Sequence, residues 1–297
     1  MNYTQGIIIK GIGGFYYVMN SEGTVFETRA CGRFRKEKTV PVVGDRVRLN
    51  ESCDSVTEIL PRTCSFIRPP VANIEQMIVV ISTVSPQVDL RLADAMLFYF
   101  ETKGADSVIC INKADIADAE DIERVKKIYE SACYKVIVAS AEENRGTDEL
   151  RVVLKNKISA FSGNSGVGKS SLLSMVCGRK LETGELSRKT QRGRHTTRHV
   201  ELIPLDFGGF VLDTPGFGRF DLPLMTTDNV KNYFREFKPF EGQCRFAGCM
   251  HTSEPGCAVL DALEKGIISE SRMESYKSFM NELRGVKEWQ LKRKGSV

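Results

Sequence analysis

The pattern of hydrophobic and polar positions changes twice along the chain. Residues 1–66 hold short runs rich in β-forming residues, separated by glycines and charged turns: GIIIK, GFYYVMN, GTVFETRA and DRVRLN. This spacing predicts a small all-β barrel. A proline-containing link from Pro61 to Pro70 then leads into a different pattern.

From residue 67 to residue 220, strand-like and helix-like segments alternate. The expected order is strand 76–82, helix 89–103, strand 107–111, helix 119–130, strand 134–140, a helix near 147–156, strand KISAFSG, a glycine-rich loop, a helix from Lys169, and strands HVELIPL and GGFVLD. Such alternation predicts a parallel sheet wrapped by helices. Residues 221–297 are polar and helical in pattern, so we expect three domains: 1–66, 67–220 and 221–297.

Composition narrows the class of protein only modestly. A chain of 297 residues with 41% hydrophobic content can build buried cores, which excludes a disordered tail. The net charge is +4, from 42 Lys and Arg against 38 Asp and Glu, so nucleic-acid binding would have to come from local clusters. No leader pattern opens the chain and no apolar run is long enough to span a bilayer. We therefore expect a soluble cytoplasmic monomer with no membrane partner.

The stretch GNSGVGKS at 163–170 has the spacing of a phosphate-binding P-loop. Its glycines let backbone N–H groups wrap phosphates at a helix N-terminus, where the helix dipole also favours anions. Lys169 would contact the β and γ phosphates, and the hydroxyl of Ser170 would ligate Mg²⁺. The alternative is a glycine-rich turn with an accidental lysine, which the strand–loop–helix context disfavours.

A second motif, NKAD at 112–115, directly follows the strand SVICI. The Asp115 carboxylate can accept from guanine N1–H and the exocyclic amine, which adenine lacks. Asn112 can meet the other edge of the base, the stem of Lys113 can lie across its ring, and Ser140–Ala141 can face the guanine carbonyl. The alternative is a polar turn in which Asp115 caps a helix.

A third motif, DTPG at 213–216, follows the strand GGFVL. Asp213 would hold Mg²⁺ through a water, the N–H of Gly216 would sense the γ phosphate, and Thr196 or Thr197 would complete the Mg²⁺ shell. The full set of expected GTP contacts is Asn112, Lys113, Asp115, Ser140, Ala141, Gly163, Asn164, Ser165, Gly166, Val167, Gly168, Lys169, Ser170, Ser171 and Gly216. Ordinary GTPases place the base-reading motif after the P-loop. Here it comes first, so the sequence predicts a circularly permuted GTPase whose loops still meet at one sheet edge.

The residue after the DTPG glycine is Phe217, where Ras-type GTPases place a water-orienting glutamine. Slow intrinsic hydrolysis is therefore expected. His195 is the internal candidate to act there, beside Lys169 as the other catalytic residue. The alternative is that His195 orders its loop or contacts RNA. The same loop, 188–198, carries five basic and no acidic residues, and a second basic stretch lies at 29–38. Phe15, Tyr16, Tyr17 and Phe34 could stack on bases there, although barrel strands bury alternate residues.

Nine cysteines are present, and six of them are scattered without a pairing pattern. The other three form C-x4-C-x-H-x5-C with a histidine: Cys244, Cys249, His251 and Cys257. Three thiolates and one imidazole make the closed tetrahedral set of a structural zinc site, with no open position for catalysis.

Taken together, the barrel with GDRV at 44–47, NKAD, GNSGVGKS, GRHTT, DTPGF and the Cys/His cluster resemble the bacterial ribosome small-subunit-dependent GTPases, the RsgA or YjeQ family. The resemblance implies an OB-like barrel, a permuted P-loop GTPase domain and a helical zinc-binding domain. It also implies hydrolysis of GTP to GDP and phosphate, binding to the 30S subunit and 16S rRNA late in subunit maturation, and stimulation by the ribosome. Two alternatives are an RNA-binding assembly factor with structural GTP and a P-loop kinase, although a kinase has no use for NKAD.

Overall fold

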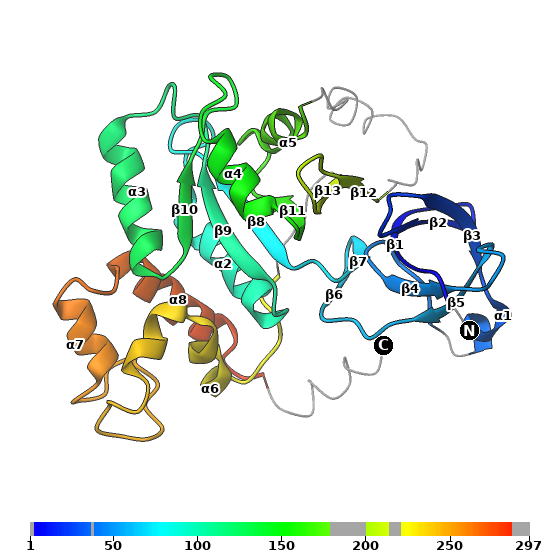
Figure 1. The fold of residues 1–297 in the computed structure, drawn as a ribbon. Coiled ribbons are helices and arrows are strands. Elements are labelled where there is room, and N and C mark those ends of the chain that lie inside the picture. Colours follow the sequence, from blue (N-terminus) through cyan, green and yellow to red (C-terminus); the bar gives the residue numbers. More distant parts are fainter. Residues whose placement is uncertain (1–2, 37–38, 179–199, 214–220, 287–297) are drawn as a thin grey trace, which may run out of the picture.

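The structure, a computed structural model, describes residues 3–36, 39–178, 200–213 and 221–286. Its N-terminal part is a closed five-stranded barrel formed by β1 (Gln5–Ile12), β2 (Phe15–Asn20), β3 (Val25–Ala30), β4 (Arg46–Leu49) and β5 (Ser55–Ile59). The strand order is β1-β2-β3-β5-β4, and β4 pairs back to β1 (Figure 1). Inward-facing Ile8, Val18 and Val47 are fully buried, which confirms the barrel predicted from the alternating pattern.

Two short elements in this part were not predicted. The helix α1 (Gly32–Lys36) follows β3. The expected link contains a small hairpin of β6 (Ser65–Ile67) and β7 (Pro70–Ala72), in which Val71 bridges to Val43 of the barrel. Strands of three residues carry too little periodicity for a sequence pattern to reveal them.

The central part is a sheet in the order β10-β9-β8-β11-β13-β12. Its strands are β8 (Gln76–Ile81), β9 (Asp106–Ile111), β10 (Lys135–Val138), β11 (Ile158–Ser162), β12 (Glu201–Pro204) and β13 (Phe210–Asp213). β8 is buried on both faces, which explains its unbroken hydrophobic run. Unlike the others, β12 runs antiparallel to β13. A tight turn joins the two, with Gly208 and Gly209 at positive φ, so no crossover helix is needed.

Helices cover both faces of this sheet. α2 (Leu90–Thr102) and α3 (Ala119–Ser131) share one buried cluster with alternate strand residues. α4 (Thr147–Leu154) and α5 (Lys169–Cys177) share the other. This three-layer arrangement is the wrapped sheet that the sequence predicted.

The C-terminal part is helical, with α6 (Thr227–Val230), the 3₁₀ turns η2 (Lys231–Tyr233) and η3 (Arg235–Phe240), α7 (Ala258–Glu264) and α8 (Glu270–Glu282). It packs against α2, whose Ala95 and Phe98 belong to the same buried cluster as Phe234, Tyr276 and Phe279. Figure 1 shows these helices beside α2 and α3, far from the barrel. The fold class is thus confirmed.

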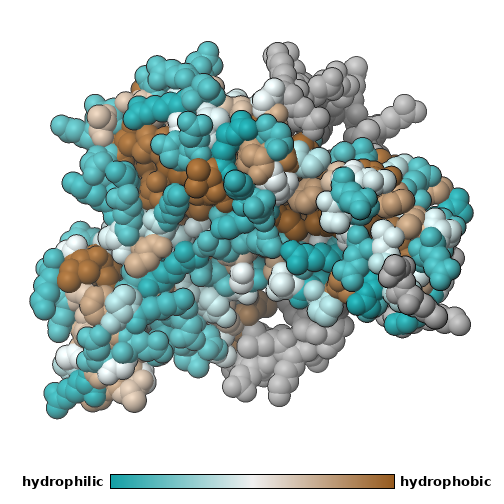
Figure 2. Space-filling model, in the orientation of Figure 1, coloured by the Kyte–Doolittle hydropathy of each residue, from teal (hydrophilic) through white to brown (hydrophobic). Residues whose placement is uncertain are grey.

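The visible face of the molecule is mostly hydrophilic, and its hydrophobic residues gather mainly over the central part (Figure 2). Among the helices of the described ranges, none has both the length and the apolar character required to cross a membrane.

Candidate nucleotide-binding site and metal centre

The P-loop runs from the end of β11 to the start of α5, as predicted. Gly163 has φ +139°, and a Cβ there would lie 2.1 Å from the carbonyl oxygen of Val80. Gly168 has φ +92°, and a Cβ there would lie 2.2 Å from Nδ2 of Asn112. Only glycine fits either position, so the motif's glycines serve both the loop conformation and close packing against the neighbouring loops.

Lys169 begins α5 and folds back over the P-loop. Its Nζ donates to the carbonyl oxygens of Gly163, at 2.8 Å, and Asn164, at 2.6 Å. Burial lowers the pKa of Lys169. A phosphate at this position would favour the charged ammonium again, because an opposite charge nearby stabilises the ionised form.

Asn112, at the end of β9, connects three loops of the site. It is only 2% exposed. Its Nδ2 donates to the carbonyl oxygen of Val167 in the P-loop at 2.8 Å, and its Oδ1 accepts from the N–H of Ala141 at 3.3 Å. The side chain therefore fixes the base-reading loop against both the P-loop and the Ser140–Ala141 turn. Contact of Asn112 with the base itself stays a prediction.

Asp115 is held in place by Ser140. The Oγ of the fully buried Ser140 donates to Oδ1 of Asp115 at 2.6 Å and itself accepts from the N–H of Glu143 at 3.1 Å. The Asp115 side chain is exposed. Its carboxylate is thus oriented by the protein while it faces the solvent, as a group that reads a base must be.

One loop of the site was not recognised from the sequence. Lys113, at φ +67°, donates through Nζ to the carbonyl oxygen of Ser85, in the loop between β8 and α2. Pro86 in that loop lies near Gly166, since its Cδ would be 3.6 Å from a Cβ on that glycine. No motif marks this segment. The one feature that could have indicated it is its position directly after a parallel strand, at the sheet edge where ligands bind.

The expected magnesium ligands are only partly described. Ser170 lies in the first turn of α5 and Asp213 ends β13, next to β11, and both are exposed. Ser165 and Ser171 are also exposed on the P-loop and α5. Four other residues assigned from the sequence lie outside the described ranges: His195, Thr196, Thr197 and Gly216.

The aromatic residues of the barrel divide into two groups. Phe34 is buried in the core, at 5% exposure. Phe15, Tyr16 and Tyr17 are half-buried. The Arg29 guanidinium lies 4.5 Å from the ring centre of Phe15, so one cation and one aromatic ring of this surface are adjacent.

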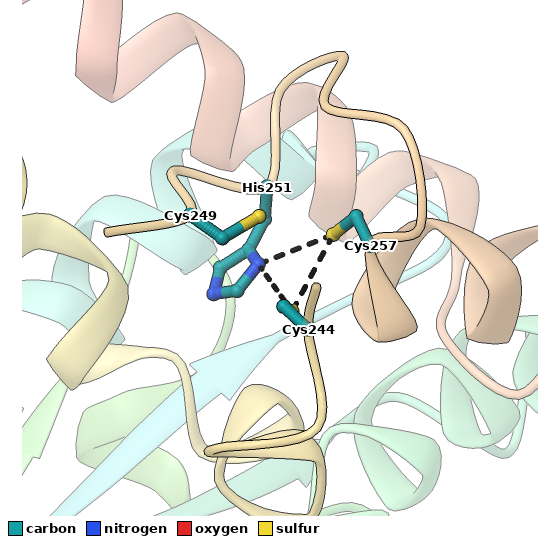
Figure 3. A group of neighbouring side chains, drawn as sticks. All are labelled: Cys244, Cys249, His251 and Cys257. Carbon is teal, nitrogen blue, oxygen red and sulfur yellow. Dashed lines mark hydrogen bonds between the residues drawn. The ribbon is translucent and has the colours of Figure 1, made fainter. Parts of the chain in front are cut away.

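The four residues of the Cys/His cluster come together (Figure 3). Their ligand atoms all lie within 4.8 Å of one another. Nδ1 of His251 is 3.3 Å from Sγ of Cys257 and 3.7 Å from Sγ of Cys244, and the two sulfurs are 3.9 Å apart. A tetrahedral ion with bonds of about 2.0–2.3 Å requires separations of about 3.5–3.8 Å. This donor set therefore fits a metal ion.

Burial also affects the protonation of the cluster's side chains. Burial raises the pKa of Cys249 to about 12 and raises that of Cys257, while burial lowers the pKa of His251. Without a compensating positive charge, neutral thiols would be held beside a neutral imidazole. A divalent ion would convert the thiols to thiolates and keep the imidazole unprotonated.

Two residues that shape this centre escaped the sequence analysis. Nζ of Lys231 donates to the carbonyl oxygen of Cys249 at 2.9 Å. The Glu254 carboxylate accepts from the N–H groups of Met250 at 2.8 Å, Thr252 at 2.8 Å and Ser253 at 3.0 Å. Both act on the backbone around the ligands, and no ligand-spacing pattern includes such residues.

Two family models match the chain. The RsgA N-terminal domain matches residues 5–56, and the RsgA GTPase matches residues 59–223. The chain belongs to the RsgA GTPase family. It is a GTP hydrolase, and the family assignment confirms the function class inferred from the permuted motifs.

Similar proteins agree with this assignment over nearly the whole length. A relative from Caldanaerobacter subterraneus subsp. tengcongensis, described as "Small ribosomal subunit biogenesis GTPase RsgA", is 46% identical over 99% of both chains. One from Moorella thermoacetica with the same description is 44% identical over 94% of this chain and 97% of its own.

Two solved structures extend the comparison to the fold. YjeQ from Thermotoga maritima has a TM-score of 0.82 at 33% identity, covering 96% of this chain and all of its own. YloQ, described as a circularly permuted GTPase, has a TM-score of 0.80 at 32% identity, covering 96% of both chains. The permutation inferred from motif order is therefore confirmed for this RsgA GTPase.

Proposed function

We propose that the protein hydrolyses GTP to GDP and phosphate on the 30S ribosomal subunit, late in that subunit's maturation, and that the subunit stimulates hydrolysis. The observation that best supports GTP binding is the pair of hydrogen bonds made by the Asn112 side chain. They hold the base-reading loop, the P-loop and the Ser140–Ala141 turn together at one sheet edge. The relatives' description as small ribosomal subunit biogenesis GTPases supports the partner. A ribosomal partner places the protein in the cytoplasm.

The residues of the site have separate roles in this proposal. Asp115 selects guanine, the P-loop and Lys169 hold the phosphates, and Ser170 and Asp213 hold Mg²⁺ with Thr196 or Thr197. Mg²⁺, when bound with GTP, offsets charge on the β and γ phosphates. The N–H of Gly216 contacts the γ phosphate.

Hydrolysis needs a group that orients water, and apolar Phe217 does not supply one. His195 is the internal candidate, and contact with the subunit would bring it into position. The free protein should therefore hydrolyse GTP slowly, and binding to the ribosomal subunit should accelerate hydrolysis.

We infer that 16S rRNA is contacted by two basic segments, 29–38 on the barrel and 188–198 next to the P-loop in the chain. Arg29 stacked on Phe15 offers the first segment both a phosphate ligand and a ring for a base. The protein acts as a monomer in this account, with domains over 1–66, 67–220 and 221–297.

We assign the metal of the Cys/His centre as one zinc ion per chain. Three thiolates and an imidazole at near-tetrahedral spacing suit zinc, and the closed set gives it a structural role. Elemental analysis of freshly purified protein should find about one zinc per chain. Protein that lacks zinc but keeps a folded C-terminal region would contradict this assignment.

The deciding test of function is turnover of GTP and of ATP, each with and without purified 30S subunits. The proposal predicts slow hydrolysis of GTP alone, strong stimulation by 30S, and no hydrolysis of ATP. Equal use of ATP with a small-molecule acceptor would indicate a kinase. GTP binding without turnover, even on 30S, would indicate an assembly factor with structural GTP.

A further inference from the structure

Strand β1 belongs to both the barrel and the central sheet. Its first half, through Ile7, pairs with β4 and closes the barrel. Farther along, Lys10 pairs with Glu201 of β12. Between Ile8 and Lys10 the register against β2 shifts, which marks a bulge. Bulges bend a strand locally, and beyond this one β1 keeps its pairing with β2 through Ile12 while Lys10 also reaches β12 on its other edge.

Glu201 is the middle member of a row across three strands. It lies opposite Lys10 of β1 on one side and opposite Asp213 of β13 on the other. Residues directly opposite each other point to the same face of a sheet. Nζ of Lys10 is 2.8 Å from Oε2 of Glu201. The barrel is therefore two strands away from the residue proposed to hold Mg²⁺.

The two pairings of β12 differ in extent. β12 and β13 share four register pairs, whereas β12 and β1 share one, reinforced by the Lys10–Glu201 ion pair. The side chains of that pair are 30% and 40% exposed. A partly exposed pair of this kind contributes little to stability, so it can break and re-form at low cost. When β13 moves, β12 must follow, while its contact with the barrel can be kept or lost.

We propose that the Lys10–Glu201 pair is the joint through which the barrel and the Mg²⁺ site sense each other. Lys10 and Glu201 are positioning residues that act through Asp213. A shift of Asp213 on engaging Mg²⁺ and GTP alters the pairing of β12 with β1 and so the orientation of the barrel. By linkage, binding of the barrel to a partner biases the Mg²⁺ site equally. The inference rests on the proposed function in taking the barrel as a subunit-binding surface.

Charge reversal tests the joint. Glu201→Lys or Lys10→Glu sets like charges against each other, and the double variant Lys10→Glu/Glu201→Lys restores the pair with its polarity exchanged. Each single variant should lose about tenfold in 30S stimulation while intrinsic GTP turnover stays within about twofold. The double variant should recover to within about threefold of the unmodified protein.

The matched control is Glu58→Lys. Glu58 pairs with Arg48 at 2.7 Å on the barrel, where the two side chains are 47% and 39% exposed and their strands, β5 and β4, pair with each other. The Glu58→Lys variant makes the same charge change as Glu201→Lys and should leave stimulation by 30S subunits unaltered. Full stimulation of the Glu201→Lys variant by 30S subunits would refute the proposed role of the Lys10–Glu201 pair. The proposal would also fail if Lys10→Glu lost stimulation by 30S and the double variant did not recover it, since Lys10 would then be an rRNA contact only.

A second measurement needs no ribosome. Hydrogen exchange of peptides covering residues 5–12 should differ between the complexes with GDP and with a non-hydrolysable GTP analogue, and Glu201→Lys should abolish the difference. Identical exchange in both nucleotide states of the unmodified protein would refute the coupling. If 30S subunits do not change GTP turnover but this exchange difference is seen, the proposed ribosomal partner is wrong and the coupling through Lys10 and Glu201 still holds.

Discussion

We propose that Asp115, oriented by Ser140, selects the base at the nucleotide site. Ser140 fixes one carboxylate oxygen at 2.6 Å, and the carboxylate faces solvent where guanine N1–H and the exocyclic amine would bind. The selectivity arises because a carboxylate only accepts hydrogen bonds. Xanthine carries a 2-oxo group instead of the amine and would need a donor there.

Asp115→Asn should therefore weaken GTP binding about a hundredfold and strengthen binding of xanthosine triphosphate. Each lost hydrogen bond to a charged group is worth about 1.5–3 kcal/mol, and a hundredfold corresponds to about 2.7 kcal/mol. Fluorescent-nucleotide titration measures both affinities. Asp118→Asn is the control, because Asp118 caps α3 through the N–H of Glu120 and should not affect either one. GTP affinity that survives in Asp115→Asn would refute the assignment.

Glu254 holds the backbone around the Cys/His cluster and is not one of its four proposed ligands. Burial alone would raise its pKa, but hydrogen bonds from the backbone N–H groups of Ser253, Met250 and Thr252 lower it to about 2, from an ordinary 4.5. The stabilisation from this carboxylate is therefore present above pH 4.5 and is lost as the pH falls towards 2.

Glu254→Gln should reduce zinc affinity about tenfold at neutral pH, since a neutral amide binds the three N–H groups less strongly. Competition with a chromogenic chelator measures this affinity. Glu264→Gln, on the exposed side of α7, should match the unmodified protein. Equal affinities for both variants would show that the loop does not depend on the charge.

At the scale of elements, α2 separates the nucleotide site from the C-terminal domain. Its Leu92, Ala93 and Met96 line a small cavity shared with the P-loop. On its other side, Asp94 accepts from Nη1 of Arg272 in α8 at 2.7 Å, and Nε of Arg272 donates to Glu236 at 2.6 Å. All three side chains are at most 3% exposed. Arg272 is thus the buried cation that joins the two domains.

Arg272→Met should lower the free energy of unfolding by about 3–5 kcal/mol, because two carboxylates would stay buried without their cation. Urea unfolding followed by circular dichroism measures the loss. Arg91→Met removes the exposed pair between Arg91 and Glu282, which joins the same two helices at 2.6 Å. That variant should lose less than about 1 kcal/mol. Similar losses in the two variants would contradict the buried role of Arg272.

The sequence could predict features that depend on residues close together in the chain, but it could not predict contacts between residues that are far apart. The P-loop, the NKAD motif, the Cys/His cluster and strands such as β8 are each defined by short sequence spacings, so the sequence alone could indicate them. Asp94 and Arg272 stand 178 positions apart, and Lys10 and Glu201 come from the barrel and from the central sheet. No local pattern encodes such pairs. Both β12 and β13 were predicted as strands, and the tight turn at Gly208 and Gly209 that joins them makes their pairing antiparallel.

At the scale of the whole molecule, the permuted order attaches a flanking domain at each end of the GTPase unit. The barrel precedes β8 and touches β12, while the chain after β13 leads to the C-terminal domain. Movement at Asp213 can therefore reach both domains through one strand or a short connection.

If the barrel and the Mg²⁺ site are coupled as proposed, the bound nucleotide also controls how tightly the protein binds the small subunit, and the affinity for 30S particles tests this coupling most directly. It should be measured with a non-hydrolysable GTP analogue and with GDP, at low and at moderate salt. We expect about hundredfold tighter binding with the analogue, which requires about 2.7 kcal/mol of differential contact. Binding should also weaken steeply with salt as counterions are released from rRNA. Equal affinity in the two nucleotide states would contradict the account, even with every nucleotide contact assigned correctly.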